Sequence, residues 1–378
     1  MRRTRLVSIA ALVAAGTVTL TACGSSGGGT TNSTPPSNGG GGNSSSSSST
    51  AGGNCGTGTL NGSGSTAQTN AMDAWRKAYQ QQCSGTTINY DSIGSGDGIA
   101  AFTDNKADFA GSDAALDPKE EVPPAQKRCG NPPLDLPMVV GPIAIAYNLS
   151  GVKSLTLNAS TISQIFLGKI KTWNDPAIAA LNKGVNLPAT AIKPFYRADD
   201  SGTTYNFESY LAAAAPKDFT STPSKVSSDA HFAGQGQTGS QGVADSVTKT
   251  SGGIGYMEYS YAVKAQLPYA QIDSGSGPVQ LTPTTASKAI STAKVVGTGN
   301  DLSLSIDYGQ NTAGAYPLVL VTYEIVCTKY KTAATGTFVK SFLNYTIGDG
   351  QKVLLGLGYA PVPDTLATKV KASIAKIS

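Results

Sequence analysis

The stretch GSGST, residues 62–66, stands where an expected strand gives way to an expected helix. The strand covers 58–61, and the apolar residues of the segment 71–82 recur at helical spacing. GSGST itself contains only small, uncharged residues. The first N–H groups of a helix lack intrahelical partners and carry a partial positive charge, so glycines and hydroxyls placed there favour an anion site.

The same kind of junction occurs twice more. SIGSGDG (92–98) follows an expected strand at 87–90, RADDSGTT (197–204) follows one at 193–196, and a helical pattern comes after each. Alternating strands and helices are typical of an α/β fold. A single such junction favours ordinary helix capping by Ser and Thr. Three junctions favour a shared anion, provided that they converge in space.

Charged residues at or after two of the junctions narrow the choice of ligand. The planar guanidinium of Arg197 suits a tetrahedral oxyanion, and Asp199 lies two residues on, where it can fix the arginine. Asp113 ends the segment DFAGSD (108–113). A carboxylate repels a bare oxyanion and fits only a ligand that brings a proton, as phosphate does near neutral pH and sulfate does not. Asp113 as a helix cap or surface residue is an equal alternative.

The first 54 residues have the composition of an export and anchoring segment. A basic start and an apolar stretch at 6–20 run into Leu20-Thr21-Ala22-Cys23, which resembles the lipobox of bacterial lipoproteins. We expect a lipoprotein signal peptide at 1–22 and lipidation of Cys23; an ordinary signal with a chance cysteine is the alternative. Residues 24–54 hold no charge, so 23–54 is expected to be a lipidated, disordered Gly/Ser/Pro tether spanning roughly 30 Å. The expected location is the extracytoplasmic face of the cell membrane.

The sequence lacks the residues that several classes of function need. Removing Arg2, Arg3 and Arg5 with the signal peptide lowers the formal charge from +4 to +1, so no nucleic-acid partner is expected. A Ser-His-Asp hydrolase needs a histidine, and the single one, His231, lies in a Gly/Ser/Gln-rich segment typical of a solvated loop. The chain has no G-x-x-x-x-G-K-[ST] motif and no Cys-x-x-Cys. We therefore expect no catalytic residues, no metal and no cofactor.

Four cysteines remain once Cys23 is assigned to a lipid. In an exported protein, an even number of cysteines implies disulfides. Cys55, Cys83, Cys129 and Cys327 allow three connectivities. We favour Cys55–Cys83 and Cys129–Cys327, of which the second would join an early segment of the chain to a late one.

The junction segments taken together resemble a known family. They are similar, in order and spacing, to the phosphate-binding lipoproteins that serve the high-affinity phosphate ABC importers of bacteria. The segments that carry the likeness are GSGSTAQTNAMDAW (62–75), YDSIGSGDGIAAF (90–102), ADFAGSDAAL (107–116), IFLGKIKTWNDPAIAALN (165–182) and YRADDSGTTYNFESYL (196–211). The resemblance runs from about residue 60 to the C-terminus and includes GGIGYMEYSYA (252–262) and YPLVLVTYEIV (316–326).

The resemblance implies an α/β, two-lobed periplasmic-binding-protein (type II) fold, each lobe a mixed sheet flanked by helices, with hinge crossovers. Lobe 1 would hold 55–140 and 311–378, and lobe 2 would hold 141–310. Inorganic phosphate would be the ligand, the membrane subunits of an ABC phosphate permease the partner, and a monomer the expected state. The alternatives are a binding protein for another oxyanion (sulfate or molybdate) or an organic phosphate, and, from another class, a secreted phosphatase.

The resemblance also assigns residues to the ligand. The phosphate-binding positions would be Thr66, Ala67, Ser95 and the proton acceptor Asp113 in lobe 1, with Arg197, Asp199, Ser201, Gly202 and Thr203 in lobe 2. Ala67 departs from the family pattern, in which this position is often aromatic, but its role is that of a backbone N–H. Because the aspartates and the phosphate outweigh the single arginine in charge, we expect oriented N–H and O–H donors to hold the ligand.

Overall fold

The computed structural model of the chain describes residues 55–378. The signal peptide, the lipidated Cys23 and the tether predicted for 1–54 lie outside the described residues. Within 55–378, no helix combines the length and apolar character needed to cross a membrane.

The elements alternate between strands and helices, as the sequence predicts. Up to the long fourth strand they are β1 (Gly58–Gly64), α1 (Thr69–Gln82), β2 (Thr86–Ser92), α2 (Ser95–Thr103), β3 (Phe109–Ser112), α3 (Val122–Cys129) and β4 (Pro133–Tyr147). The middle of the chain forms β5 (Thr156–Leu157), α4 (Ala159–Phe166), α5 (Pro176–Leu181), β6 (Lys193–Arg197), α6 (Gly202–Ala214), the 3-10 helix η1 (Ser227–Ala230), β7 (Gln235–Gln237), α7 (Gly239–Lys249), β8 (Gly253–Glu258) and α8 (Tyr259–Lys264). The remaining elements are β9 (Gln271–Asp273), β10 (Pro278–Val279), α9 (Pro283–Ile290), β11 (Lys294–Val295), β12 (Leu304–Ser305), β13 (Val319–Cys327), α10 (Ala333–Thr346), α11 (Gln351–Leu354), the 3-10 helix η2 (Leu355–Leu357) and α12 (Asp364–Ile374).

Eight strands form one mixed sheet in the order β2-β1-β3-β13-β4-β8-β6-β7. β1 pairs in parallel with β2 and β3, and β6 pairs in parallel with β7 and β8. β13 and β4 run antiparallel to each other and to their outer neighbours β3 and β8. We call β2, β1, β3, β13 and β4 up to Pro142 the first sheet half, and the rest of β4 with β8, β6 and β7 the second sheet half. A mixed sheet flanked by helices confirms the predicted α/β class.

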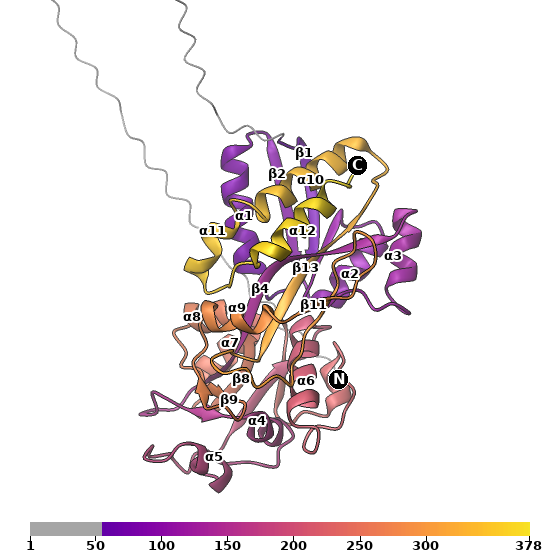
Figure 1. Cartoon of the computed structure of the whole chain (residues 1–378). Helices are drawn as coiled ribbons and strands as arrows, with labels where there is room; N and C mark the ends of the chain where they lie inside the picture. Colours follow the sequence, from indigo (N-terminus) through magenta and orange to yellow (C-terminus); the bar gives the residue numbers. More distant parts are fainter. Residues whose placement is uncertain (1–54) are drawn as a thin grey trace, which may run out of the picture. The chain divides into compact units, whose positions relative to one another are not determined.

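Strand β4 joins the two sheet halves. All of its 15 residues are buried, and its apolar run fits a strand that is covered on both faces. It pairs with β13 as far as Pro142 and with β8 from Ile143 onward. Proline cannot donate to a strand ladder, and Pro137 is accommodated where the register against β13 shifts between Thr322 and Tyr323. β4 and β13 thus carry the chain out of the first half and back into it, as Figure 1 shows.

Helices cover both halves, and each half buries one tryptophan. α1, α10 and α12 pack together beside the first half, whereas α7 and α8 pack on β8 and β4 in the second (Figure 1). Trp75 on α1 is fully buried, and its indole N–H donates to the Gly350 carbonyl at 2.9 Å. Trp173 is likewise buried and donates to the Gly252 carbonyl at 3.2 Å.

Two of the predicted junctions are shorter than expected, because the helices begin earlier. α2 starts at Ser95, within SIGSGDG, and α6 starts at Gly202, within RADDSGTT. At α6 the cause is local: Ser201 accepts a hydrogen bond from the Thr204 N–H at 3.2 Å and caps the helix there. The small residues of both junctions therefore form first helical turns, where N–H groups lack intrahelical partners.

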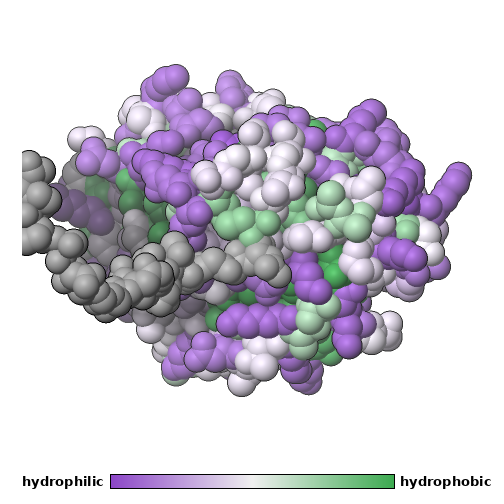
Figure 2. Space-filling view, turned by 90° about the horizontal axis from the view of Figure 1, so that it is seen from above, coloured by the Kyte–Doolittle hydropathy of each residue, from purple (hydrophilic) through white to green (hydrophobic). Residues whose placement is uncertain are grey.

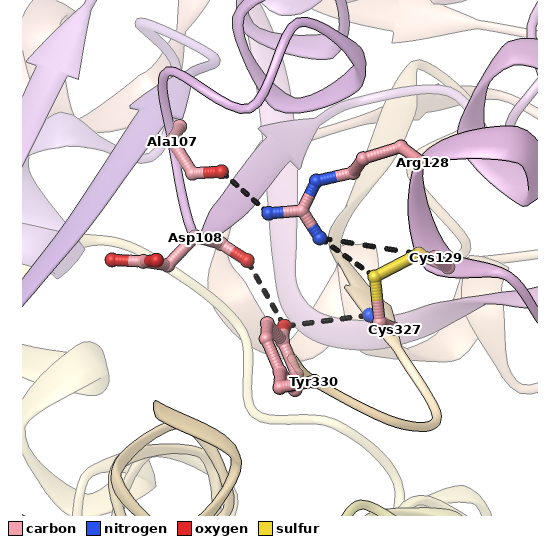
Figure 3. The surroundings of a disulfide bond; sticks show 6 residues. All are labelled: Ala107, Asp108, Arg128, Cys129, Cys327 and Tyr330. Carbon is pink, nitrogen blue, oxygen red and sulfur yellow. Dashed lines mark hydrogen bonds between the residues drawn. A yellow bond between two sulfur atoms is a disulfide. The ribbon is translucent and has the colours of Figure 1, made fainter. Parts of the chain in front are cut away.

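The structure contains both favoured disulfides, Cys55–Cys83 and Cys129–Cys327. The second joins the end of α3 to the end of β13 over a separation of 198 residues. Figure 3 shows Arg128 beside this bond, where its guanidinium donates to the Ala107 carbonyl at 2.8 Å. The guanidinium also lies 3.9 Å from the centre of the Phe102 ring, so a cation–π contact supports the pairing of α2 with α3.

The surface in Figure 2 is mostly hydrophilic, with hydrophobic residues showing between the polar ones. Large hydrophobic side chains that are exposed come from separate elements of the described chain, for example Ile93, Val226 and Leu355. Scattered exposed hydrophobic residues of this kind are ordinary for a globular domain.

Candidate functional site

The predicted site residues come together where strands of both sheet halves end and helices begin. β1 leads through the first junction to α1, and β3 ends just before Asp113. From the second half, β6 ends at Arg197 and α6 begins at Gly202. The carboxyl ends of parallel strands are the usual place for ligands in open α/β sheets. The predicted site residues therefore converge in space, as a shared ligand requires.

Asp113 lies at the centre of a set of hydroxyl donors and is only 3% exposed. Its Oδ1 accepts hydrogen bonds from Ser65 Oγ at 2.5 Å and Thr322 Oγ1 at 2.8 Å. Its Oδ2 accepts one from Thr203 Oγ1 at 3.0 Å. Burial raises the pKa of Asp113, while these three hydroxyls and the positive charge of Arg197 oppose the rise. The carboxyl is thus held in one orientation by residues from both sheet halves.

Arg197 is the buried cation of the site, with 1% of its surface exposed. Its Nε donates to Asp199 Oδ1 at 2.6 Å, and its Nη2 donates to the other carboxylate oxygen. Burial alone would raise the pKa of Asp199, but the hydrogen bonds and charge of Arg197 and the Gly239 N–H lower it. The predicted bracing of the guanidinium by Asp199 is present, and it leaves Nη1 directed to Ser240 Oγ at 3.4 Å.

The first junction meets the second sheet half at Thr66. Ser240 at the start of α7 donates its backbone N–H to Thr66 Oγ1 at 3.1 Å, and the two hydroxyl oxygens are also 3.1 Å apart. The Tyr261 hydroxyl, also from the second half, donates to the Thr66 carbonyl at 2.6 Å. Ala67 is fully buried, and its N–H donates to Ser65 Oγ at 3.0 Å.

The start of α6 is pressed against the second junction. Ser95 Oγ accepts the Asp113 N–H at 3.2 Å. A side chain added at Gly202 would place its Cβ 2.6 Å from Ser95 Oγ and 2.8 Å from Asp113 Cβ, so only glycine allows this approach. Thr203 follows directly and reaches Asp113. All nine predicted ligand positions therefore lie in or beside one buried cluster, although Ser201 is seen here in the role of a helix cap.

Other residues in the cluster were not predicted. Ser65, Thr322, Gly239 and Ser240 contact Asp113, Asp199 or Thr66. Gly239 and Ser240 start α7 directly after β7, so TGS at 238–240 is a fourth small-residue junction that the sequence displays. Thr322 sits in an apolar strand and has no such signal.

A cavity of about 1080 Å³ adjoins the cluster on one side. It shares Asp113 with the site but is otherwise lined mainly by the segment before α3, the start of β4, the β11–β12 segment and α6. The residues of the cluster itself are almost fully buried. The arrangement suits a ligand of a few atoms enclosed by donors from both halves, rather than a large ligand in an open groove.

The fold and this site together define a solute-binding domain of the periplasmic-binding-protein kind. A family model described as PBP superfamily domain matches residues 49–349. A solved structure of a high-affinity periplasmic phosphate-binding protein, PfluDING, has a TM-score of 0.68 and 23% identity, covering 83% of this chain and 93% of that one. This likeness supports the fold.

Relatives found by sequence are more similar to this chain than that solved structure is. The chain is 44% identical to the phosphate-binding protein PstS2 of Mycobacterium bovis (strain BCG), over 100% of both chains. It is 40% identical to the phosphate-binding protein PstS 3 of Mycobacterium tuberculosis (strain H37Rv), again over 100% of both. The chain therefore belongs to the PstS family of phosphate-binding proteins.

Proposed function

We propose that this protein is an extracytoplasmic, non-enzymatic solute-binding protein that captures inorganic phosphate and delivers it to an ABC permease. The family, whose members named above are phosphate-binding proteins, supports the ligand. A solved structure with the same fold is described as bound with phosphate. Among residues 55–378 no group of His, Cys, Asp and Glu is arranged to hold a metal ion.

The observation that carries the proposal is that Asp113 and Arg197 both lie in one buried cluster. Arg197 and the helix N-termini supply donors for a tetrahedral oxyanion. Asp113 accepts three hydroxyl hydrogen bonds, and no salt bridge among residues 55–378 includes it. A carboxylate beside an anion site is tolerable when the anion donates a proton to it, and phosphate does so near neutral pH. Sulfate would place two acceptors against each other.

We further propose that the two sheet halves belong to two lobes, 55–140 with 311–378 and 141–310, which close on the ligand. Donors to the proposed ligand come from both, so the closed form is the one that satisfies all four phosphate oxygens. β4 would form part of the hinge, because it alone among the eight strands pairs with strands of both sheet halves.

Thermal unfolding with and without phosphate tests the function. A ligand present at about 100 times its Kd stabilises the native state by about 2.7 kcal/mol. For a domain of this size we expect the Tm to rise by roughly 5 °C with phosphate. The same concentration of sulfate is the control and should leave the Tm unchanged. An equal rise with both anions, or no rise with phosphate, would count against the proposal.

An ion pair beside the site should stabilise the closed form. Lys225, from the segment before η1, pairs with Glu121 at the start of α3, and both side chains are mostly buried, at 13% and 20% exposure. Nearby, the Gly96 N–H donates to the Asp200 carbonyl at 3.2 Å, so the two halves also touch through backbone. Partly buried ion pairs are worth more than exposed ones, which contribute about 0–1 kcal/mol.

We therefore expect Lys225→Met to weaken phosphate binding about fivefold to tenfold in isothermal titration calorimetry, mainly through faster dissociation. Lys106→Met is the matched control, because Lys106 pairs with Asp104 on the exposed surface of one half, at 72% and 57% exposure. That control should bind like the wild type. Equal affinities for all three proteins would mean that the Lys225–Glu121 pair plays no part in closure.

The N-terminal segment is assigned a supporting role. We propose that Cys23 is lipidated after removal of 1–22, and that 23–54 tethers a monomeric binding domain to the extracytoplasmic face of the cell membrane, within reach of the permease. The sequence around Cys23 supports this assignment. Replacement of Cys23 by serine should release the protein into the soluble fraction, and retention of that variant in the membrane fraction would contradict it.

A further inference from the structure

Glu324 is a buried carboxyl that the proposed phosphate site does not use. It lies in the middle of β13, in register with Gly111 on β3 and Leu136 on β4. Its exposed fraction is 0%, and neither of its carboxyl oxygens accepts a hydrogen bond from any residue of 55–378. Two ionised carboxylate oxygens without donors in a dry interior are costly. The protonation state of Glu324 therefore needs an explanation.

A second unpartnered acceptor lies beside it. Gln68, just before α1, lies on the same face of the sheet: Gly111 is in register with Glu324, and a Cβ at Gly111 would lie 1.8 Å from Gln68 Nε2. The Gln68 amide nitrogen donates to the Tyr90 hydroxyl at 2.9 Å, which leaves its Oε1 as the free end, and that oxygen is also buried without a donor. The side chains of Gln68 and Tyr90 have room because residue 111 is glycine: a Cβ there would lie 1.8 Å from Gln68 Nε2 and 2.4 Å from the Tyr90 hydroxyl oxygen. A proton on Glu324 gives both orphaned groups a partner at once.

The charges around Glu324 favour the same state. The titratable groups that face it are Asp113, beyond the end of β3, and Tyr90 on β2; α1 and β4 contribute the neutral Gln68 and Leu136. No salt bridge of the described residues includes Glu324. Burial raises the pKa of Glu324 well above its usual value, the charge of Asp113 adds to the rise, and Gln68 opposes it.

With Glu324 neutral, the donors point in one direction toward the site. A protonated Glu324 would donate to Gln68 Oε1. Gln68 Nε2 donates to the Tyr90 hydroxyl at 2.9 Å, and the Tyr90 hydroxyl donates to the Ser65 carbonyl at 3.0 Å. In a trans peptide the C=O and the next N–H point in opposite directions. Anchoring the Ser65 carbonyl therefore fixes the direction of the Thr66 N–H. An ionised Glu324 would instead attract the Gln68 amide nitrogen, and the reversed amide would draw the Tyr90 proton away from Ser65.

We propose that Glu324 is a positioning residue for the oxyanion site: as a neutral carboxylic acid it fixes the Ser65–Thr66 peptide through Gln68 and Tyr90. The assignment rests on the proposed function only where phosphate affinity is concerned. Protonation of Glu324 and orientation of the peptide are properties of the protein without ligand, and they can be measured separately.

Infrared spectroscopy and unfolding at several pH values test the protonation. At pH 7 the difference spectrum between the wild type and Glu324→Gln should show a carboxylic-acid C=O band, and the difference between the wild type and the control Glu120→Gln, where the side chain is exposed, should show none. Because the folded pKa of Glu324 is raised, only the unfolded state ionises above its usual pKa. The unfolding constant of the wild type relative to Glu324→Gln should therefore rise about tenfold per pH unit from about pH 5 until the pH reaches the raised pKa of Glu324. The absence of that band, or a constant ratio, would overturn the proposal.

Two variants test the positioning role. The glutamine of Glu324→Gln still donates to Gln68 Oε1, so the amide resonance of Thr66 should keep its wild-type chemical shift in the ligand-free protein. Phosphate affinity should stay within about twofold of the wild type. Glu324→Leu removes the donor, and we expect a shifted Thr66 resonance and about tenfold weaker phosphate binding.

The result that overturns the positioning role is a Glu324→Gln protein whose Thr66 resonance moves, since charge rather than the donated proton would then matter. This measurement decides even if Glu324→Leu fails to fold. A wild type that binds no phosphate would refute the proposed function, while the infrared and resonance data would still decide the role of Glu324.

Discussion

Replacement of Arg197 by methionine should weaken phosphate binding about 1000-fold. The guanidinium is 1% exposed and pairs with Asp199 through two nitrogens, so its loss removes the cation of the site and leaves a buried carboxylate unpaired. Truncating one partner of a buried charge pair between a protein and its ligand costs about 2–5 kcal/mol of affinity, which corresponds to a factor of about 30 to several thousand. Calorimetry with phosphate at pH 7.5 measures the loss directly.

Two further variants separate binding from folding. Arg197→Met combined with Asp199→Asn removes both charges, so its thermal stability should recover while phosphate binding stays lost. Arg76→Met is the matched control, because Arg76 pairs with Asp73 on the surface of α1, with 31% of its side chain exposed. It should bind phosphate normally. Phosphate binding by the double variant near the wild-type level would show that Arg197 does not contact the ligand.

Replacement of Asp113 by asparagine should change selectivity more than any other single substitution. An asparagine can donate where the carboxylate only accepts, so an anion without a proton is no longer rejected. A site with a fixed acceptor can discriminate by a factor of about 10⁴ or more. We expect the ratio of phosphate to sulfate affinity to fall to about 10 or below, with phosphate itself weakened. Competition calorimetry measures both anions, and an unchanged ratio would refute the proton-acceptor role of Asp113.

The pH dependence of the wild type should follow the same logic. Burial raises the pKa of Asp113 above 3.8, so its neutral form appears at a higher pH than in an exposed aspartate. The neutral acid can donate to sulfate as the asparagine would. Sulfate affinity is therefore expected to rise as the pH falls through the pKa of Asp113, and the selectivity for phosphate is expected to be full above it. The Asp113→Asn variant should show no such change.

Local signals accounted for much of the fold and for most of the cluster. GSGST, SIGSGDG and RADDSGTT each combine a preceding strand pattern with a following helical one, and each covers the end of a strand that is followed by a helix. Arg197 and Asp199 are two residues apart, so an extended chain places them side by side without any long-range contact. The error at α6 was one of boundary, because Ser201 caps the helix earlier than the apolar period indicates.

The residues that were missed reach the site through tertiary pairing. β13 inserts between β3 and β4 although it begins 172 residues after the end of β4, and only this order brings Thr322 to Asp113. Nothing in the sequence next to Thr322 indicates that insertion. Ser240 could have been found, because the TGS junction before α7 repeats the pattern of the other three. Glu324 can be recognised in the sequence for a different reason. It is a lone acidic residue within an apolar strand, and such a residue requires a partner or a proton.

The most direct test of the account is a crystal structure of the protein grown with phosphate. We predict one phosphate ion enclosed between the two sheet halves, with oxygens bound by Arg197 and by the N–H groups that begin α6. A further phosphate oxygen should lie within hydrogen-bond distance of Asp113, the carboxylate accepting its proton. A phosphate bound elsewhere, or one whose oxygens all avoid Asp113, would contradict the account.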